Sequence, residues 1–123
     1  MAIILIVEDD VFICEIAELI IDDLGHNTLP ASDVSEALLH LRSSQRIDAL
    51  FTDVHLQEAV LGGFELARHA VDIRPELRVL YTTGNSVNDE MAALFVDGAH
   101  FLQKPYTQMQ LQNSIDHLLA ASI

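Results

Sequence analysis

Four short apolar runs, each followed by a carboxylate, a hydroxyl or an ammonium group, constrain the fold of this chain most strongly. Continuous apolar runs of this length are typical of strands that are covered on both faces. The carboxyl ends of parallel strands meet at one edge of a sheet, and ligands bind at that edge. We therefore expect the polar groups that follow the runs to lie together. The runs and the residues after them are 3–7 with Glu8, Asp9 and Asp10, 49–52 with Asp53, 79–82 with Thr83, and 101–103 with Lys104.

Apolar residues at helical spacing fill most of the stretches between these runs. Strands and helices that alternate along a chain predict an α/β fold with a parallel sheet and right-handed crossovers. We expect a doubly wound, flavodoxin-like (βα)5 sandwich with strand order 2-1-3-4-5 and helices on both faces. The expected strands are 2–7, 26–31, 47–53, 77–82 and 99–103, and the expected helices are 12–24, 34–41, 64–73, 87–96 and 107–119.

Local signals set the expected limits of the helices. Gly25 is placed to end the first helix, and Gly62 and Gly63 interrupt the regular pattern, so residues 55–63 are expected to form a loop. Capping residues should start three of the helices: Asp33 with Glu36, Thr107 with Gln110, and either Asn85 or Ser86. The apolar stripe expected on the first helix consists of Phe12, Ile16, Leu19, Ile20 and Leu24.

Composition narrows the class of function. The 123 residues suit one domain, and 6 basic against 19 acidic residues give a formal charge of −13. This balance disfavours direct binding to nucleic acid or to an anionic membrane surface, and it favours a bound cation or a basic partner. Cys14 is alone, so no internal disulfide forms, and a cytoplasmic location is the simplest interpretation. Residues 2–7 are too short for a membrane span or a signal sequence.

The expected neighbours of Asp53 point to phosphoryl chemistry. In the strand order 2-1-3-4-5, Asp53 lies beside Glu8 and Asp9, and three close carboxylates need a counter-charge. Oxygen ligands of this kind suit Mg²⁺, which leaves coordination positions free for a phosphoryl oxygen. Lys104 adds a positive charge and Thr83 a hydroxyl donor. A carboxylate can act as the nucleophile of phosphoryl transfer, and Asp53, the lone acid at its strand end, is the better candidate.

The set Glu8-Asp9, Asp53, Thr83-Gly84 and Lys104-Pro105, in this order, resembles the receiver domain of two-component response regulators, and the resemblance covers residues 1–123. It implies a phosphoacceptor signalling domain rather than an enzyme. Asp53 would take a phosphoryl group from a phosphohistidine of a sensor histidine kinase or a histidine phosphotransfer protein. Asp9 would bind Mg²⁺ directly and Glu8 through water, and the backbone carbonyl of His55 would be a further ligand.

The resemblance also implies a conformational switch. Thr83 and Lys104 would bind the phosphoryl oxygens, and Phe101 would turn inward as Thr83 moves toward the phosphate. The output surface would be the fourth helix, the fifth strand and the fifth helix, roughly residues 87–119, serving a downstream protein or a homodimer. From the sequence we expect no output domain after the last helix. The loop at 57–63 is longer than in many members of the family and lacks an aspartate that they carry.

Three alternatives stay open at this point. An aspartyl-phosphate-type phosphohydrolase would want a second aspartate two residues after the first, where this chain has His55. A flavodoxin-like electron carrier would need a phosphate loop after the first strand, where Glu8 and the acids beside it would repel a phosphate. A receiver-like module that signals without phosphorylation is the third alternative.

Overall fold

Strands and helices alternate along the chain in a computed structural model that describes residues 2–56, 62–84 and 87–120. All neighbouring strands pair in parallel, and the sheet order is β2-β1-β3-β4-β5. The doubly wound fold predicted from the apolar runs is confirmed. The strands are β1 Ile3–Val7, β2 Asn27–Ala31, β3 Ala49–Asp53, β4 Arg78–Thr83 and β5 His100–Gln103. The helices are α1 Val11–Asp23, α2 Val34–Arg42, α3 Gly62–Ile73, α4 Asp89–Ala92 and α5 Gln108–Ala120.

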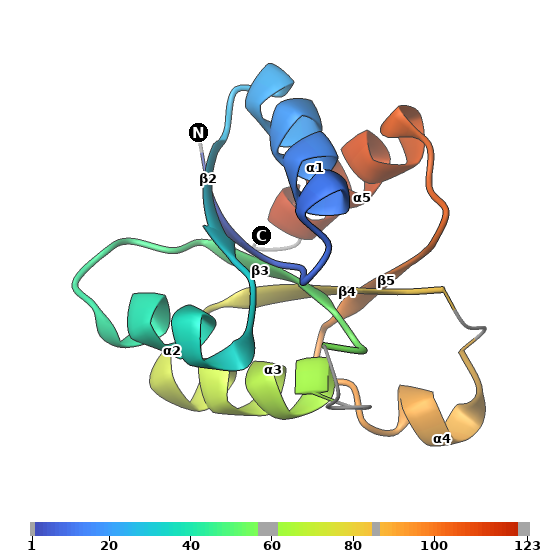
Figure 1. Cartoon of the computed structure of the whole chain (residues 1–123). Helices are drawn as coiled ribbons and strands as arrows, with labels where there is room; N and C mark the ends of the chain where they lie inside the picture. The colour runs from blue at the N-terminus through green and yellow to red at the C-terminus, as the bar shows by residue number, and fades with distance from the viewer. Residues whose placement is uncertain (1, 57–61, 85–86, 121–123) are drawn as a thin grey trace.

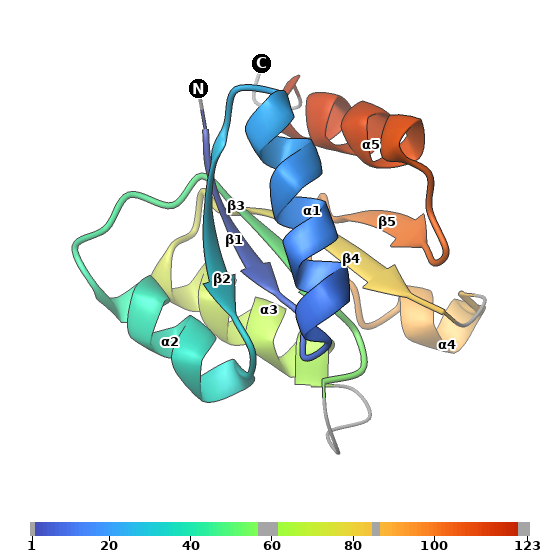
Figure 2. The ribbon, with the colours of Figure 1, turned by 45° about the horizontal axis from the view of Figure 1, so that its top comes forward.

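The helices cover both faces of the sheet (Figures 1 and 2). Helices α1 and α5 lie on one face, and α2, α3 and α4 lie on the other. Along β1, Ile4 and Ile6 belong to the core under α1 and α5, while Leu5 and Val7 belong to the core on the opposite face. Both faces of the central strands are therefore buried, which is why these runs are apolar throughout instead of alternating with polar residues.

The strand register brings the polar ends of the runs to one edge. Val7 pairs with Thr52, and Asp53 pairs with Thr82, so the segments that follow β1, β3 and β4 leave the sheet side by side. Capping residues start the helices beyond this edge. Asp10 accepts hydrogen bonds from the amides of Phe12 and Ile13 at 3.0 and 3.1 Å. It is therefore the N-terminal cap of α1.

Both capping-box predictions are confirmed in position. The Thr107 hydroxyl accepts from the Gln110 amide at 3.1 Å, and the Gln110 side chain accepts from the Thr107 amide at 2.8 Å. Asp33 likewise accepts from the Glu36 amide at 2.8 Å. The reciprocal bond of Glu36 goes one residue further back, to the amide of Ser32.

The helix predicted for α1 is present, but its predicted apolar stripe is wrong at three of its five residues. Phe12, Ile16 and Leu19 are 78, 53 and 66% exposed, whereas Ile20 and Leu24 pack against the core. The residues that α1 buries are the smaller Cys14 and Ala17 together with Ile21. Both sets repeat at helical spacing, so periodicity alone could not choose between them.

Helix α3 begins at Gly62, so the expectation that Gly62 and Gly63 belong to a loop is wrong. The Gly63 amide donates to the carbonyl oxygen of Val54 at 2.8 Å. A Cβ at Gly63 would overlap the backbone carbonyl oxygen of Asp53 and lie 2.7 Å from the Cα of Val54. Glycine here permits a close approach of a helix to a strand end instead of breaking the helix. The rest of the 55–63 loop includes residues 57–61, which lie outside the described residues.

Helix α4 is much shorter than the predicted helix at 87–96. Its N-terminal cap is Asn88, whose side chain accepts from the Met91 amide at 2.8 Å, and the helix runs from Asp89 to Ala92. The expected caps Asn85 and Ser86 lie outside the described residues. A continued helix would have bonded the Val96 amide to the carbonyl of Ala92. That amide donates instead to the hydroxyl of Tyr81 at 3.2 Å, so a tertiary hydrogen bond replaces a helical one.

Candidate functional site

Glu8, Asp53 and Lys104 meet at the carboxyl edge of the sheet, where the sequence predicted them. The Lys104 ammonium lies 2.6 Å from Glu8 Oε1 and 3.0 Å from Asp53 Oδ2. The side chains of Glu8 and Asp53 are only 5 and 9% exposed, and that of Lys104 is 19% exposed. A single ammonium group thus bridges two buried carboxylates that come from residues far apart in the chain.

The second oxygen of each carboxylate is bound to backbone. Glu8 Oε2 accepts from the Asp10 amide at 3.2 Å, and Asp53 Oδ1 accepts from the His55 amide at 3.2 Å. Both carboxylates are therefore held in one orientation from two sides. The metal-binding role that we predict for the backbone carbonyl of His55 stays a prediction, since the contact shown for this residue uses its amide.

Burial and pairing act against each other in this cluster. Burial raises the pKa of Glu8, and the hydrogen bonds from Lys104 and from the Asp10 backbone offset part of that effect. For Lys104, burial alone would lower the pKa, but hydrogen bonds to Glu8 and Asp53 outweigh it, so the pKa is raised. The ammonium stays charged because it neutralises the two carboxylates. The two buried carboxylates thus favour a positive charge at this position.

The same edge has the donor set of a site for a hard divalent cation. One carboxylate oxygen from each of Glu8, Asp9 and Asp53 lies within 4.8 Å of the others. Asp9 is exposed while the other two are buried, so the cluster opens to solvent on the side of Asp9. Oxygen-only ligands with net negative charge suit Mg²⁺. The described residues therefore fit the predicted ion.

Thr83 and Phe101 lie in different surroundings. Thr83 ends β4, is fully buried, and its carbonyl accepts from the Lys104 amide at 2.9 Å, which ties the two strand ends together. Phe101 is partly buried and stacks on Phe95 at 6.2 Å between ring centroids. Phe101 therefore belongs to the core beside the site rather than to the acidic cluster. The peptide bond between Lys104 and Pro105 is cis.

Two residues near Asp53 were not singled out from the sequence. Thr82, the cross-strand neighbour of Asp53, is 3% exposed, and its hydroxyl has no hydrogen-bond partner among the described residues. Tyr106 packs its ring 6.2 Å from that of Phe51, and burial raises its pKa to about 12. Both residues line a hollow of about 10 Å³ beside Glu8 and Asp53, which is room for a single water molecule. Their types are common in cores, so the sequence carried no signal for them.

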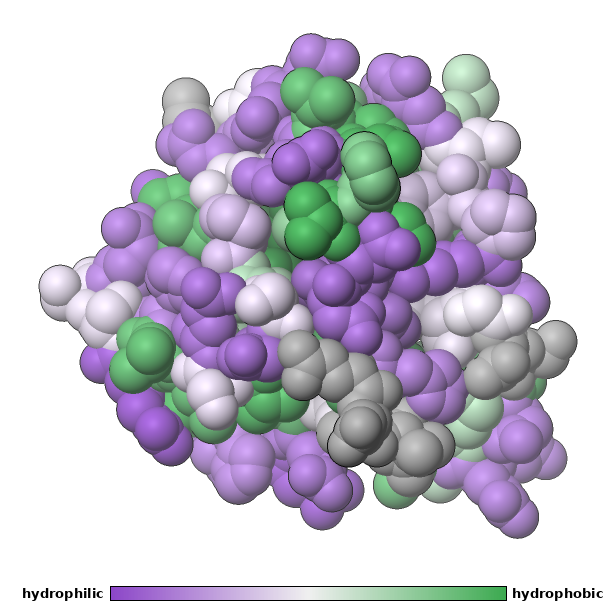
Figure 3. Space-filling view, viewed as in Figure 1, coloured by the Kyte–Doolittle hydropathy of each residue, from purple (hydrophilic) through white to green (hydrophobic). Residues whose placement is uncertain are grey.

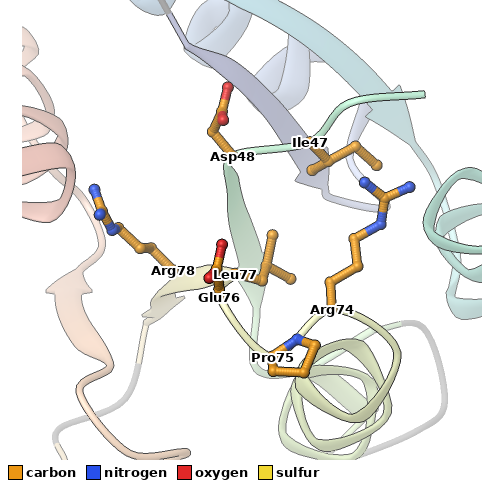
Figure 4. Close-up of a pocket in the computed structure, with 7 residues that line it drawn as sticks. All are labelled: Ile47, Asp48, Arg74, Pro75, Glu76, Leu77 and Arg78. Atoms are coloured by element: carbon orange, nitrogen blue, oxygen red, sulfur yellow. The ribbon is translucent and has the colours of Figure 1, made fainter. Parts of the chain in front are cut away.

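A larger hollow, of about 810 Å³, lies at the amino ends of β3 and β4, away from the acidic cluster (Figure 4). Its two guanidinium groups point apart. Arg74 donates to the carbonyls of Leu41 and Ser43, and Arg78 donates to that of Leu119 at 2.6 Å. Both arginines thus bind the carboxyl-terminal ends of helices, where cations are favourable. The two arginines therefore have a structural role. Ligands of parallel sheets bind at the opposite edge, so we do not assign a ligand to this hollow.

No helix in the described ranges is long and apolar enough to cross a membrane.

The fold and the site define a class of protein: a flavodoxin-like domain with an acidic, lysine-bridged site at the carboxyl edge of its sheet. Comparison with known proteins gives the family. The family model described as "Response regulator receiver domain" matches residues 4–116. The chain belongs to this family and is a signalling domain of the two-component type.

Individual relatives agree with this assignment. The chain is 30% identical over 109 residues to the nitrogen assimilation regulatory protein NtrX of Azorhizobium caulinodans, covering 88% of this chain but 24% of that protein. A response regulator receiver protein from Sinorhizobium medicae matches with a TM-score of 0.88 and 28% identity, over 98% of this chain and 95% of that one. NtrX from Brucella abortus, in complex with ATP, matches with a TM-score of 0.86 and 32% identity, over 98% of this chain and 27% of that one. The chain therefore spans about a quarter of the length of the NtrX proteins that it matches.

Proposed function

We propose that this domain is a phosphoacceptor in which Asp53 takes a phosphoryl group from a phosphohistidine of a sensor histidine kinase or a histidine phosphotransfer protein. The observation that carries the proposal is the Lys104 ammonium, 2.6 Å from Glu8 and 3.0 Å from Asp53 inside a buried acidic cluster. The ammonium and the backbone amide hold the buried carboxylate of Asp53 in one position, and a carboxylate can act as a nucleophile in phosphoryl transfer. We propose that residues 1–123 act as one receiver domain.

In the proposed reaction, a carboxylate oxygen of Asp53 forms a bond to phosphorus while the N–P bond of the phosphohistidine breaks. The imidazole leaves with the electron pair of that bond. Lys104 and the Thr83 hydroxyl would bind the phosphoryl oxygens as charge develops on them. Glu8, Asp9 and Asp53 would hold Mg²⁺, which when bound neutralises charge on the phosphoryl oxygens. Self-catalysed loss of the phosphoryl group to water is part of the same proposal.

The exposed apolar face of α1 supports docking of a protein as the phosphoryl donor. Val11, Phe12, Ile16 and Leu19 are all more than half exposed, and hydrophobic atoms gather over α1 in the space-filling view (Figure 3). A hollow of about 270 Å³, lined in part by Ile16 and Lys104, joins this face to the site. Exposed apolar patches of this kind mark protein interfaces. We therefore place the phosphohistidine partner against α1.

The output of the domain belongs to the same proposal. We propose that a downstream protein, or a second copy of the chain, binds the surface of α4, β5 and α5, roughly residues 87–119. Thr83 and Phe101 would change position on phosphorylation and so alter that surface. No observation favours a phosphohydrolase, and a cytoplasmic location remains a prediction.

Intact mass tests the phosphoacceptor role. The protein is incubated with Mg²⁺ and acetyl phosphate, next to Asp53→Asn and Asp10→Asn. Asp10→Asn is the matched control: it makes the same chemical change in the acid that caps α1, and asparagine also caps helices. We expect one added phosphoryl group in the wild type and in Asp10→Asn, and none in Asp53→Asn or without Mg²⁺.

The opposite results separate the alternatives. Phosphoryl uptake by Asp53→Asn would refute the assignment of the acceptor. No uptake by the wild type, together with no beryllofluoride adduct, would favour a receiver that signals without phosphorylation. Sustained release of phosphate from many molecules of donor per molecule of protein would favour the phosphohydrolase.

A further inference from the structure

Four aromatic rings form one cluster on the side of the sheet covered by α3 and α4. The ring centroids of Tyr81 and Phe95 lie 4.8 Å apart, and those of Phe64 and Tyr81 lie 5.0 Å apart. Phe95 also lies 5.7 Å from Phe64 and 6.2 Å from Phe101. These separations are those of aromatic pairs in contact. Phe95 is thus the ring that touches each of the other three.

Each of those three other rings is joined to a residue of the candidate site. Tyr81 precedes Thr83 by two residues on β4, so the two side chains lie on the same face of the strand. Phe101 lies on β5, whose end leads directly to Lys104. Phe64 follows Gly63, which packs against the backbone carbonyl of Asp53. The cluster is therefore connected along the chain to Thr83 and Lys104, and through Gly63 to Asp53.

Phe95 differs because it lies in the connection between α4 and β5, residues 93–99, on the proposed output surface. Helix α4 has no fully buried residue, and Met91 is the side chain of this helix that packs, partly buried, against the described core. The connection is held by partly buried apolar side chains such as Phe95 and by the hydrogen bond from the Val96 amide to the Tyr81 hydroxyl, at 3.2 Å. Tyr81 itself is 0% exposed and fixed in the sheet.

We propose that Tyr81 and Phe95 form a latch that holds residues 93–99 against the sheet in the unphosphorylated domain, and that release of this latch carries the signal to the output surface. The inference rests on the proposed function in one respect, that phosphorylation of Asp53 releases the latch. The latch itself is a property of the unphosphorylated chain. Tyr81 acts as a positioning residue, because its side-chain contacts with the described residues are with Phe64, Phe95 and the Val96 amide and not with the acidic cluster.

Removing the hydroxyl alone tests the latch. Tyr81→Phe keeps the ring and its stacking but leaves the Val96 amide without its acceptor. Val96 is only partly buried, so its amide can regain a partner by moving toward water. The loss of one neutral hydrogen bond corresponds to a change of roughly fivefold in the opening equilibrium. Tyr106→Phe is the matched control, because it removes the same atom from a largely buried tyrosine on the opposite face of the sheet.

Amide hydrogen exchange, followed by mass spectrometry or NMR, provides the readout. Without phosphate, we expect exchange at residues 93–99 to be about fivefold faster in Tyr81→Phe than in the wild type and unchanged in Tyr106→Phe. Amides of β1 and α2 should exchange at wild-type rates in both variants. With Mg²⁺ and beryllofluoride, exchange at 93–99 should rise in the wild type and rise less in Tyr81→Phe. Uptake of one phosphoryl group from acetyl phosphate should persist in Tyr81→Phe.

Two results would overturn the latch. Exchange at residues 93–99 within twofold of the wild type would show that the hydroxyl does not hold the connection. Equally faster exchange across the whole sheet would show that the hydroxyl only stabilises the fold. If Tyr81→Phe does not fold, Phe95→Leu removes the central ring instead and is expected to open the same segment. Failure of the wild type to take up phosphate would refute the proposed function, while the comparison without phosphate would still decide the latch.

Discussion

Replacing Lys104 by methionine tests the electrostatics of the site most directly. The side chain of methionine is about as long as that of lysine but has no ammonium group. In the wild type this group lies 2.6 Å from Glu8 and 3.0 Å from Asp53. Unit charges about 4 Å apart interact by about 4 kcal/mol at the effective dielectric constant of such sites. Removing one partner of a buried ion pair costs about 3–5 kcal/mol. We therefore expect the variant to lose about 3 kcal/mol of unfolding free energy in EDTA.

Magnesium should restore much of this loss. In the wild type the ion would compete with the ammonium for the carboxylate of Glu8, whereas in Lys104→Met this competition would be absent. A ligand present at 100 times its dissociation constant stabilises a protein by about 2.7 kcal/mol, and a tenfold gain in affinity adds about 1.4 kcal/mol. At 10 mM Mg²⁺ we expect the variant to be stabilised by at least about 1.4 kcal/mol more than the wild type.

Urea unfolding in EDTA and in Mg²⁺ measures both quantities. Arg46→Met is the control. Arg46 also forms an ion pair, with Asp48, but the side chain of Arg46 is 67% exposed. Exposed pairs contribute little, so this variant should stay within about 0.5 kcal/mol of the wild type and gain no extra stability from Mg²⁺. Equal stabilisation of Lys104→Met and wild type by Mg²⁺ would refute the idea that the ammonium and the cation compete for the same carboxylates.

Three further predictions concern packing, docking and the thiol. Gly63→Ala should lower the free energy of unfolding in urea by about 2–3 kcal/mol, because its Cβ would overlap the carbonyl of Asp53. Gly84→Ala, at a position with open space around it, should stay within about 0.5 kcal/mol of the wild type. Equal losses in the two variants would contradict the close approach of α3 to β3. Phe12→Ser should slow phosphoryl transfer from a phosphohistidine protein about tenfold or more and leave the rate with acetyl phosphate within about twofold. Leu39→Ser, which changes an exposed residue of α2, should alter neither rate. An equal loss of rate with both donors would show that α1 is not the docking face. Burial raises the pKa of Cys14 to about 11 from an ordinary value near 9, so the stability that this thiol contributes is complete below about pH 9 and is lost as the pH rises toward 11. Disulfide reagents should therefore label Cys14 slowly at pH 8 in the folded protein and rapidly in urea, and fast labelling in the folded state would show that the thiol is exposed.

Most of the fold and the centre of the site could be predicted from the sequence, for physical reasons that these residues illustrate. A strand buried on both faces has to be apolar along its whole length, so β1 and β3 stand out in the chain. A buried acid such as Asp53 then needs a counter-charge, and the strand order brings Lys104 to it from 51 residues away. The roles of these residues in phosphoryl transfer remain predictions.

Other parts of the site could not be read from the sequence, because they depend on which face of an element meets which neighbour. Thr82 and Tyr106 are of residue types that are common in cores. The strand register places Thr82 beside Asp53, and the fold of the chain after β5 brings Tyr106 to the same hollow. Gly63 carried a signal, but an ambiguous one: a glycine interrupts a helix or permits close packing, and the contact with the Asp53 carbonyl decides in favour of packing.

The two largest errors of the sequence-based prediction fall on the two surfaces to which we assign partners. On α1, large apolar residues were expected in the core, yet Phe12, Ile16 and Leu19 face solvent next to the site, where a phosphohistidine protein would dock. In the α4–β5 connection, a helix was expected, yet the Val96 amide leaves the helical pattern for the Tyr81 hydroxyl.

These two departures have a common physical origin. Natural sequences agree with their folds at most positions, and disagreement concentrates where residues serve a function other than local stability. A residue that binds a partner keeps an apolar side chain in water, and a segment that moves is held by a contact that can open rather than by a continuous helix. If Phe12→Ser impairs only protein-dependent transfer and Tyr81→Phe loosens only residues 93–99, both departures are functional. If neither variant has its local effect, the departures reflect packing alone, and the partner surfaces lie elsewhere on the domain.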